Sequence, residues 1–431
     1  MVELLPTKCS KKVIIIAGTT GVGKSQLSIQ LAKRFNGEVI NSDSMQVYKD
    51  IPIITNKHPL KERDGISHHV MNHVDWTEEY YLHRFEKECL DAIDDIHSRG
   101  KTAIVVGGTH YYLQVLFNKH LDSQTRTPTQ EENEILSSGD PKLVYKTLQT
   151  HDPLIANKFH PNDTRRVQRM LEIYYRTGKK PSEMYSEQVT QLIYDTLCLW
   201  LYSDPKPLET RLDERVDKML ENGGMEEIRQ LHEFYKNKKY TMEQCENGVW
   251  QVIGFKEFLP WLNNDPNITL EECVDRMKIR TRQYAKKQVK WIKKMLIPDI
   301  EGSIYLLDAS DLSQWDSMVK ERSMKIAQEF VSNRSIEESF APQRLEGLLA
   351  RKVQPLRTAD DWKQHTCSVC FDQEGNELIA IGEKNWKIHL NSRRHRSNSS
   401  RGSRKLAFEK WKAEQKSPNA GNRTNVEVNF S

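Results

Sequence analysis

The stretch that decides the fold is VIIIAGTTGVGKS, residues 13–25. Its second part matches the phosphate-loop pattern G-x-x-x-x-G-K-[ST], and the apolar run before it predicts a buried strand that leads into the loop. In such a loop, glycines let backbone amides curl around phosphate oxygens, and the start of the next helix adds positive charge. Lys24 supplies a point charge, and the Ser25 hydroxyl is a predicted ligand for Mg²⁺. The predicted phosphate-binding residues are Gly18, Thr19, Thr20, Gly21, Val22, Gly23, Lys24 and Ser25.

Apolar runs and amphipathic stretches alternate on the C-terminal side of this loop. Helical spacing covers 25–35 and 78–99, and strands are predicted at 13–17, 38–40, 102–106, 196–202 and 303–308. Strands separated by helices indicate a parallel sheet with crossover connections. The sequence therefore predicts an α/β fold whose core is a parallel sheet like that of P-loop NTPases.

Composition limits the class of protein. The chain has 431 residues, a formal net charge of +4, and no apolar run long enough to span a bilayer. Its seven cysteines are odd in number and scattered, which argues against a disulfide framework and for a reducing compartment. Residues 351–431 hold 16 Lys and Arg against 9 Asp and Glu, so this segment carries +7 and the remainder −3. A basic tail of this kind suits a polyanionic partner.

Polar residues follow the second and third predicted strands. NSDSMQVY at 41–48 comes directly after the second, and GGTHYY at 107–112 ends the third. The carboxyl ends of parallel strands share one edge, so both segments should face the phosphate loop. Asp43 is a candidate general base, although an Asp in such a turn is often a helix cap. Ser44 and Gln46 could read a base edge, and Thr109 lies at the same rim, where a tight turn is the alternative.

These segments resemble the tRNA dimethylallyltransferases, also called tRNA isopentenyltransferases. The motifs that carry the resemblance, in order along 13–294, are 18–25, 41–48, 107–113, HPND at 160–163 with 165–169, 213–219 with 226–227, GFKE at 254–257 and TRQYAK at 281–286. The resemblance implies transfer of a dimethylallyl group from its diphosphate to N6 of the adenosine 3′ of the anticodon. It also implies that the loop holds the prenyl diphosphate instead of ATP.

The implied chemistry assigns roles to the rim residues. Asp43 would remove the proton from the adenine amine, while Lys24, Mg²⁺ and the loop amides would stabilise the leaving diphosphate. Thr19 would donate to the oxygen that bridges carbon and phosphorus. Thr109 and Arg282 would also bind the diphosphate. The predicted tRNA-binding residues are Asp43, Ser44, Met45, Gln46, Thr109, Arg165, Arg166, Val167, Gln168 and Arg169. For the arginines, a solvated helix face is the alternative.

Two positions depart from the pattern of bacterial relatives. His110-Tyr111-Tyr112 replaces the usual Gly-Leu-Tyr, and Gln251-Val252 stands where an Arg is common. The sequence therefore does not identify which residues shape the prenyl pocket and the diphosphate clamp.

A basic helix is predicted over 276–294. Nine Lys and Arg residues occur there with no acidic residue. Met277, Thr281, Tyr284 and Gln288 follow one another at intervals of three or four residues, which places them on one buried face of the helix. Unopposed charges on the remaining faces would repel one another, and a polyphosphate partner would relieve this repulsion. The sequence therefore favours an RNA-facing helix.

A second metal site is predicted near the C-terminus. Cys367 and Cys370, followed by His389 and His395, supply the two thiolates and two imidazoles that tetrahedral Zn²⁺ prefers. The long gaps resemble the single matrin/U1-type zinc finger associated with RNA. Basic residues continue beyond it, which suits a nucleic-acid backbone, with protein binding or nuclear targeting as alternatives.

The predicted organisation follows from these motifs. Residues 1–114 form the first part of the P-loop core, 115–192 an inserted helical tRNA-binding domain and 193–332 the second part with the basic helix. A linker at 333–358, a zinc finger at 359–398 and a basic, partly disordered tail at 399–431 complete it. We expect a monomer in the cytoplasm, with mitochondrial and nuclear pools left open.

Two other classes of function remain open at this point. One is a kinase or ATPase with an RNA-binding tail, for which Asp308 could hold the metal. The other is a catalytically idle RNA-binding protein on the same scaffold. The first predicts tight binding and turnover of ATP. The second predicts that Asp43→Ala leaves the affinity for tRNA and the cellular role unchanged.

Overall fold

The computed structural model describes residues 9–117, 126–187, 191–300, 304–350, 359–372 and 375–400. The predicted basic tail beyond residue 400 lies outside these ranges. The chain divides into two compact units, one of residues 1–119 with 189–352 and one of 120–188 with 353–431. This grouping differs from the predicted organisation, because the insertion and the C-terminal segment fall into the same unit. None of the described helices is both long and apolar enough to cross a membrane.

The first unit is built on a parallel sheet, as predicted. Its strand order is β3-β2-β4-β1-β5-β6, with every pairing parallel. The strands are β1 (Cys9–Gly18), β2 (Gly37–Asn41), β3 (His68–His69), β4 (Thr102–Gly107), β5 (Tyr194–Tyr202) and β6 (Ile304–Asp308). Only the two-residue edge strand β3 was not predicted, because it is too short to show a period. The α/β fold class is therefore confirmed.

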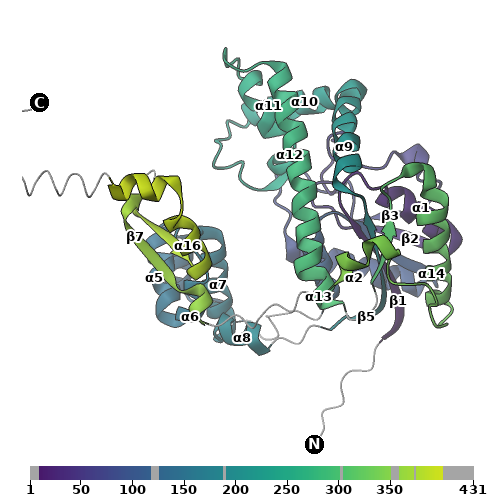
Figure 1. The fold of residues 1–431 in the computed structure, drawn as a ribbon, viewed down its shortest axis with the longest axis horizontal. Coiled ribbons are helices and arrows are strands. Elements are labelled where there is room, and N and C mark those ends of the chain that lie inside the picture. The colour runs from purple at the N-terminus through teal and green to yellow at the C-terminus, as the bar shows by residue number, and fades with distance from the viewer. Residues whose placement is uncertain are drawn as a thin grey trace, which may run out of the picture. The chain divides into compact units, whose positions relative to one another are not determined.

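Successive residues of β1 face two helical layers. Val13 and Ile15 pack in the core on the side of α2 (Leu82–Ser98), which contributes Phe85. Ile14 and Ile16 pack on the side of α1 (Lys24–Arg34) and α14 (Arg322–Val331), which Figure 1 shows side by side. Burial on both faces explains why this central strand is continuously apolar.

A helical lobe continues the first unit and has its own core around Phe255 and Phe258. Its helices are α9 (Pro205–Met219), α10 (Met225–Asn237), α11 (Phe255–Leu262) and α12 (Leu270–Trp291), and the shorter α3 (His110–Leu113), α13 (Ile297–Asp299) and α15 (Glu346–Leu349) belong to the same unit. A capping box between Thr269 and Glu272 fixes the start of α12. This helix is the longest described, and it runs past α9 (Figure 1).

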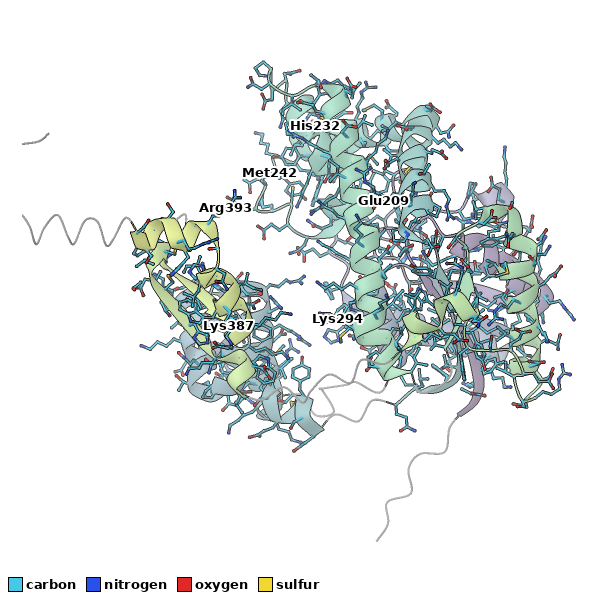
Figure 2. The ribbon with its side chains drawn as sticks, in the orientation of Figure 1. Glu209, His232, Met242, Lys294, Lys387 and Arg393 are labelled. Carbon is cyan, nitrogen blue, oxygen red and sulfur yellow. The ribbon has the colours of Figure 1, made fainter. Side chains whose placement is uncertain are left out.

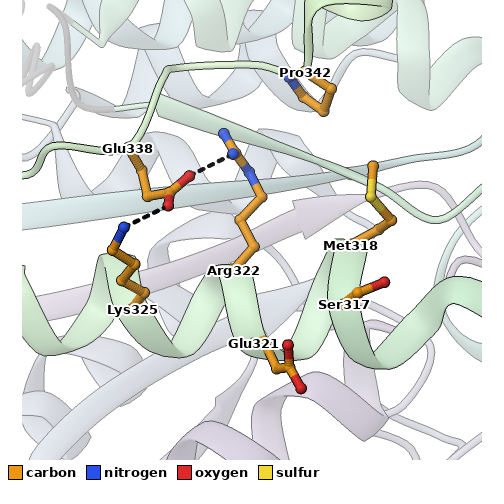
Figure 3. A pocket seen from close by; sticks show the side chains of 7 residues that line it. All are labelled: Ser317, Met318, Glu321, Arg322, Lys325, Glu338 and Pro342. Atoms are coloured by element: carbon orange, nitrogen blue, oxygen red, sulfur yellow. Dashed lines mark hydrogen bonds and ion pairs between the residues drawn. The ribbon is translucent and has the colours of Figure 1, made fainter.

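The first half of the predicted linker belongs to the core. Ala341 and Leu345 are buried, and the Leu306 amide of β6 donates to the Phe340 carbonyl over 2.7 Å. Arg322 and Lys325 of α14 both bind Glu338, at 2.6 and 2.9 Å (Figure 3). The shallow hollow beneath this contact is lined by Ser317, Met318, Glu321, Arg322, Lys325, Glu338 and Pro342. The sequence pattern did not predict these contacts, because the composition of this part of the linker is polar.

The second unit combines helices of the insertion with the Cys/His segment. The helices are α4 (Gln130–Ser137), α5 (Pro141–His151), α6 (Pro153–Asn157), α7 (Thr164–Thr177) and α8 (Pro181–Glu187). The segment contributes the hairpin β7 (Gln364–Phe371) and β8 (Glu377–Ile381) with α16 (Glu383–Leu390). Gln364 Nε2 donates to Tyr145 Oη at 2.7 Å and to the Phe159 carbonyl at 3.0 Å. The finger therefore packs on the insertion.

Candidate functional site

The phosphate loop joins β1 to α1. Gly23 stands just before α1 with φ 92°, and a Cβ there would lie 2.6 Å from the Trp315 ring. Lys24 Nζ donates to the Thr19 carbonyl at 2.7 Å, which keeps the ammonium group inside the loop. The Thr19 hydroxyl is buried and has no hydrogen-bond partner in the described part of the chain. An unpartnered buried hydroxyl is costly unless a ligand uses it, so the loop fits an oxygen-rich anion.

Asp43 stands at the end of β2 in a tight local turn. The side-chain oxygen of Asn41 accepts from the Asp43 amide at 3.1 Å, and Asn41 Nδ2 donates to the Val70 carbonyl at 2.9 Å. Asp43 Oδ1 accepts from the Met45 amide at 2.9 Å. No helix begins here, so the alternative of a helix cap does not apply. The turn holds a carboxylate at the rim.

Burial and opposite charges set the electrostatics of the rim. Burial raises the pKa of Asp43, opposed by the Met45 amide and the positive charge of Lys24. Burial lowers the pKa of Lys24 to about 8, although the charge of Asp43 acts in the other direction. A carboxylate with a raised pKa is a better proton acceptor than an exposed one. The site therefore pairs a base with a cation-lined anion loop.

The end of β4 completes the rim. Thr109 Oγ1 accepts from the Ser44 amide at 3.1 Å and donates to Ser44 Oγ at 3.2 Å. Gly108 makes a close approach, because a Cβ there would lie 2.3 Å from Gln288 Nε2. The structure thus brings the loop 18–25, Asp43 and Thr109 together, as the sequence predicts, and uses Thr109 to hold Ser44.

Two residues at this site were missed by sequence reasoning. Arg215 of α9 donates from Nη2 to Thr20 Oγ1 at 2.7 Å. Gln288 of α12 accepts from the Thr20 amide at 2.8 Å and donates to the Gly108 carbonyl at 2.8 Å. A glutamine on an apolar helical stripe is a signal, since buried amides need partners. Arg215 lies within the 213–219 motif, but the neighbouring sequence contains no pattern that assigns it to the phosphate loop.

Arg282, a predicted part of the diphosphate clamp, pairs with a carboxylate of α9 in this structure. Its guanidinium binds both carboxylate oxygens of Asp213 on α9, at 2.5 Å each. Helical periodicity is the reason, because Thr281, Tyr284 and Gln288 share the inward face and Arg282 points sideways. Arg215 places a guanidinium at the loop.

Comparisons with known proteins agree with this geometry. The IPP transferase family profile matches residues 46–295, and the isopentenyl transferase profile matches residues 11–66. The tRNA dimethylallyltransferase of Saccharomyces cerevisiae is 65% identical over 412 residues, which cover 94% of this chain and 96% of the yeast protein. The human tRNA dimethylallyltransferase is 34% identical over 89% of this chain and 85% of the human protein. The chain belongs to the IPP transferase family.

Solved structures of IPP transferase relatives share the fold. A eukaryotic dimethylallyltransferase acting on tRNA aligns with a TM-score of 0.88 at 66% identity, covering 94% of this chain and 100% of that one. The tRNA isopentenylpyrophosphate transferase of Bacillus halodurans aligns with a TM-score of 0.52 at 30% identity, covering 75% and 99%. The family resemblance of the sequence is therefore confirmed.

Several residues predicted to bind tRNA in this IPP transferase have hydrogen-bond partners within the protein. Gln46 Nε2 donates to the carbonyls of Thr55 and Asn56 at 3.2 and 3.1 Å, which braces the loop after Asp43. This amide group is occupied, so its predicted contact with a base would be left to Oε1. Ser44 is tied to Thr109 as described above.

The predicted arginine cluster on α7 is also mostly engaged. Val167 is buried in the core of the second unit, so its side chain cannot contact RNA there. Arg166 Nε binds Asp163 at 2.6 Å, and Arg169 Nη1 binds Glu172 at 2.8 Å. Gln168 Nε2 donates to the Leu136 carbonyl at 2.9 Å. Helix capping and i,i+3 pairing compete with the predicted role.

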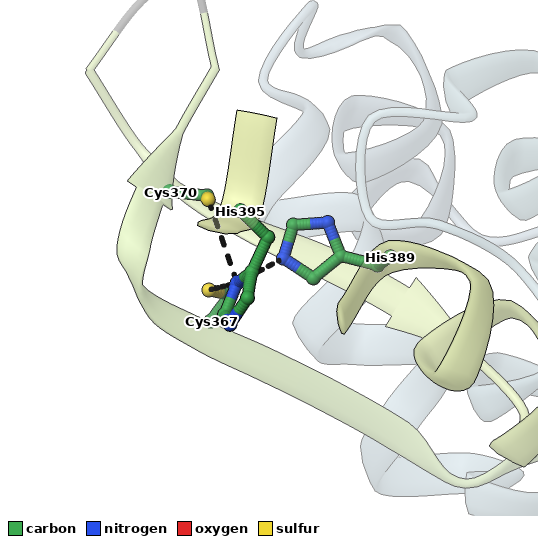
Figure 4. A group of neighbouring side chains, drawn as sticks. All are labelled: Cys367, Cys370, His389 and His395. Atoms are coloured by element: carbon green, nitrogen blue, oxygen red, sulfur yellow. Dashed lines mark hydrogen bonds between the residues drawn. The ribbon is translucent and has the colours of Figure 1, made fainter. Parts of the chain in front are cut away.

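The predicted zinc ligands converge in the second unit (Figure 4). The ligand atoms of Cys367, Cys370, His389 and His395 all lie within 4.8 Å of one another. His395 Nδ1 lies 3.4 Å from Cys367 Sγ and 3.1 Å from His389 Nε2. Two thiols and two imidazoles at this spacing fit a tetrahedral Zn²⁺.

Proposed function

We propose that this protein is a tRNA dimethylallyltransferase that moves the dimethylallyl group from its diphosphate to N6 of the adenosine 3′ of the anticodon. The observation that carries the proposal is the rim itself. There, a carboxylate with a raised pKa stands beside a phosphate loop whose buried Thr19 hydroxyl has no described partner. Membership of the IPP transferase family supports dimethylallyl diphosphate as the donor of the prenyl group and tRNA as its acceptor.

The reaction requires one bond to form and one to break. The adenine N6 attacks the carbon that bears the diphosphate, the carbon–oxygen bond breaks, and diphosphate leaves. The proton on N6 passes to Asp43, whose raised pKa suits acceptance of that proton. A base in a stacked helix cannot reach such a site, whereas a loop nucleotide can flip out at little cost.

The charge on the departing diphosphate is met by the loop. Lys24 and the amides of the loop supply positive charge, and Arg215, tied to Thr20, adds a second cation. Thr19 donates its buried hydroxyl to the bridging oxygen. Because these donors are in place before reaction, they stabilise the leaving group without reorganisation.

Two metal ions fit the residues present. Mg²⁺ is commonly bound by one or two protein ligands and by substrate phosphates, so the Ser25 hydroxyl with the diphosphate makes a suitable set. When bound, Mg²⁺ would neutralise charge on the diphosphate. Zn²⁺ at the four Cys/His ligands would stabilise the fold of the finger, which has little apolar core of its own.

The partners that we propose are tRNA, through its anticodon stem-loop, and dimethylallyl diphosphate. We propose a monomer. Six cysteines have free thiols, which supports a reducing compartment, and we propose the cytoplasm; they are Cys89, Cys198, Cys245, Cys273, Cys367 and Cys370.

The rival hydrolase function loses its metal-holding candidate. Asp308 Oδ2 accepts from Arg344 Nε at 2.7 Å, and Asp308 Oδ1 accepts from the Ser310 amide at 3.0 Å. A carboxylate paired in this way anchors the segment after α14 and is not free to hold Mg²⁺ for ATP.

The test is transfer in vitro with labelled dimethylallyl diphosphate, Mg²⁺ and unmodified tRNA. We expect label on N6 of the adenosine 3′ of the anticodon, identified by mass spectrometry of the nucleosides, and no turnover of ATP. Absence of transfer together with ATP hydrolysis would contradict the proposed function.

A further inference from the structure

Helix α12 has three faces about 120° apart, given about 100° per residue. The inward face carries the buried Thr281 and Gln288, and Gln288 contacts the rim. A second face pairs with α9 in three ion pairs at matching four-residue intervals. Lys278–Asp217 and Lys286–Glu209 are 2.7 and 2.8 Å apart, on either side of Arg282–Asp213. These three cations therefore have counter-charges, contrary to the expectation from the sequence of α12 alone.

The third face carries five cations, four of which have no ion pair among the described residues. We call Arg276, Arg280, Lys287, Lys290 and Lys294 the outer stripe; all are exposed, and Lys294 continues the stripe into the π-helical turn Ile292–Leu296. Within the described ranges, four of them have no ion pair, and Arg280 Nε lies 3.9 Å from Glu257. Figure 2 shows Glu209 on the α9 side of α12 and Lys294 on the side turned away.

The contrast between the two charged faces argues for a ligand. An ordinary solvated helix face carries both positive and negative side chains. On the face of α12 that meets α9, acidic side chains likewise neutralise the cations. The outer stripe instead lines up like charges from Arg276 to Lys294, a length of about 27 Å at about 1.5 Å per residue. A linear array of cations on this scale complements a polyphosphate chain.

We propose that the outer stripe binds the sugar–phosphate backbone of the tRNA substrate. This inference rests on the proposed function and adds to it a contact surface outside the rim. The stripe supplies affinity and orientation without reading bases, because lysine and arginine contacts to phosphate carry no sequence information. Since Gln288 joins the same helix to Thr20 and Gly108, RNA held on the stripe is positioned relative to the diphosphate loop.

The test compares full-length variants that each lose four exposed positive charges. The stripe variant is Arg276→Gln, Lys287→Gln, Lys290→Gln and Lys294→Gln, in which glutamine keeps good helix propensity. The control is Lys61→Gln, Lys87→Gln, Lys206→Gln and Lys236→Gln, four exposed lysines of the same unit without ion pairs among the described residues. tRNA affinity is measured across salt concentrations, and transfer is measured at saturating tRNA.

We expect the stripe variant to keep its turnover at saturating tRNA and its KM for the diphosphate. Its slope of log affinity against log salt should fall by about 3, since each phosphate contact contributes about 0.7 to 0.9. Between about 50 and about 200 mM salt, the wild type should thus lose about 60-fold more affinity than the variant. The control should keep the wild-type slope.

Four outcomes would overturn the inference. An unchanged slope in an active stripe variant would leave the proposed function intact and remove the stripe from the tRNA surface. If the stripe variant kept the wild-type salt slope for tRNA but no longer bound polyglutamate, the stripe would be assigned to an acidic protein. An equal loss in the control would show that net charge, not this face, attracts tRNA. Absence of transfer by the wild type would instead overturn the proposed function, and the inference with it.

Discussion

Lys24 lies in an environment that makes its charge sensitive to pH. Burial lowers its pKa to about 8, whereas an exposed lysine titrates near 10.5. The protonated form, which binds the diphosphate, is therefore lost as the pH rises through about 8. Arginine stays charged throughout this range.

We therefore predict an alkaline limb in kcat/KM for dimethylallyl diphosphate, a quantity that reports the free enzyme. Above pH about 8 the wild-type value should fall by about tenfold per pH unit. Lys24→Arg should be less active at neutral pH, yet it should lose this alkaline limb. A limb that persisted in Lys24→Arg would assign the titration to another group.

Local pattern explains which site residues could be predicted. The loop 18–25 and Asp43 follow directly from strands whose ends share an edge, so spacing alone places them together. Arg215 and Gln288 reach the loop from helices about 195 and 268 residues further along the chain, and no short-range pattern reports such contacts. Val167, predicted to bind tRNA, is buried because helical periodicity turns its side chain into the core of the second unit.

At the scale of elements, α12 links the rim to its surroundings. Gln288 binds both the Thr20 amide and the Gly108 carbonyl, so one side chain fixes the spacing between two loops. It touches no reacting atom, and we regard it as a positioning residue.

The test of Gln288 uses a graded pair of variants. Gln288→Glu keeps an acceptor for Thr20 but cannot donate to Gly108, and Gln288→Leu loses both contacts. A buried hydrogen bond left unmade costs about 1–3 kcal/mol, so kcat/KM for the diphosphate should fall about tenfold in the first variant and further in the second. KM for tRNA should stay near the wild-type value. Gln283→Leu, on an exposed face of α12, is the control, and equal effects there would remove the positioning role.

The ladder between α9 and α12 shows why the charge of an element is hard to judge from its own sequence. The basic stretch 276–294 contains no acid, but Glu209, Asp213 and Asp217 come from a helix about 70 residues earlier. Sequence alone predicted a uniformly unopposed helix, and only the packing separates its paired face from its free one.

At the scale of the whole molecule, the chain forms two compact units. The parallel sheet was predictable from alternating patterns in the first unit. The packing of the finger on the insertion was not, because it depends on polar contacts such as Gln364 with Tyr145 between segments far apart in the chain.

Removal of zinc should therefore affect the second unit as a whole. We predict that chelation, or Cys367→Ser, unfolds the hairpin β7–β8 and also weakens α5 and the turn at Phe159 after α6, which lose the contacts of Gln364. Hydrogen exchange should rise in both segments, while the sheet of the first unit stays protected and still binds dimethylallyl diphosphate. Exchange confined to the finger would show that the insertion is stable without it.

The central claim is that Asp43 removes the proton while the phosphate loop holds the diphosphate. The most direct measurement is the single-turnover rate of transfer to tRNA, at saturating substrates, for the wild type and Asp43→Asn. Because a positioned general base contributes about 10²- to 10⁴-fold, we predict a fall of that size in Asp43→Asn with unchanged binding of diphosphate and tRNA. A rate equal to that of the wild type would contradict the assignment of Asp43 as the base.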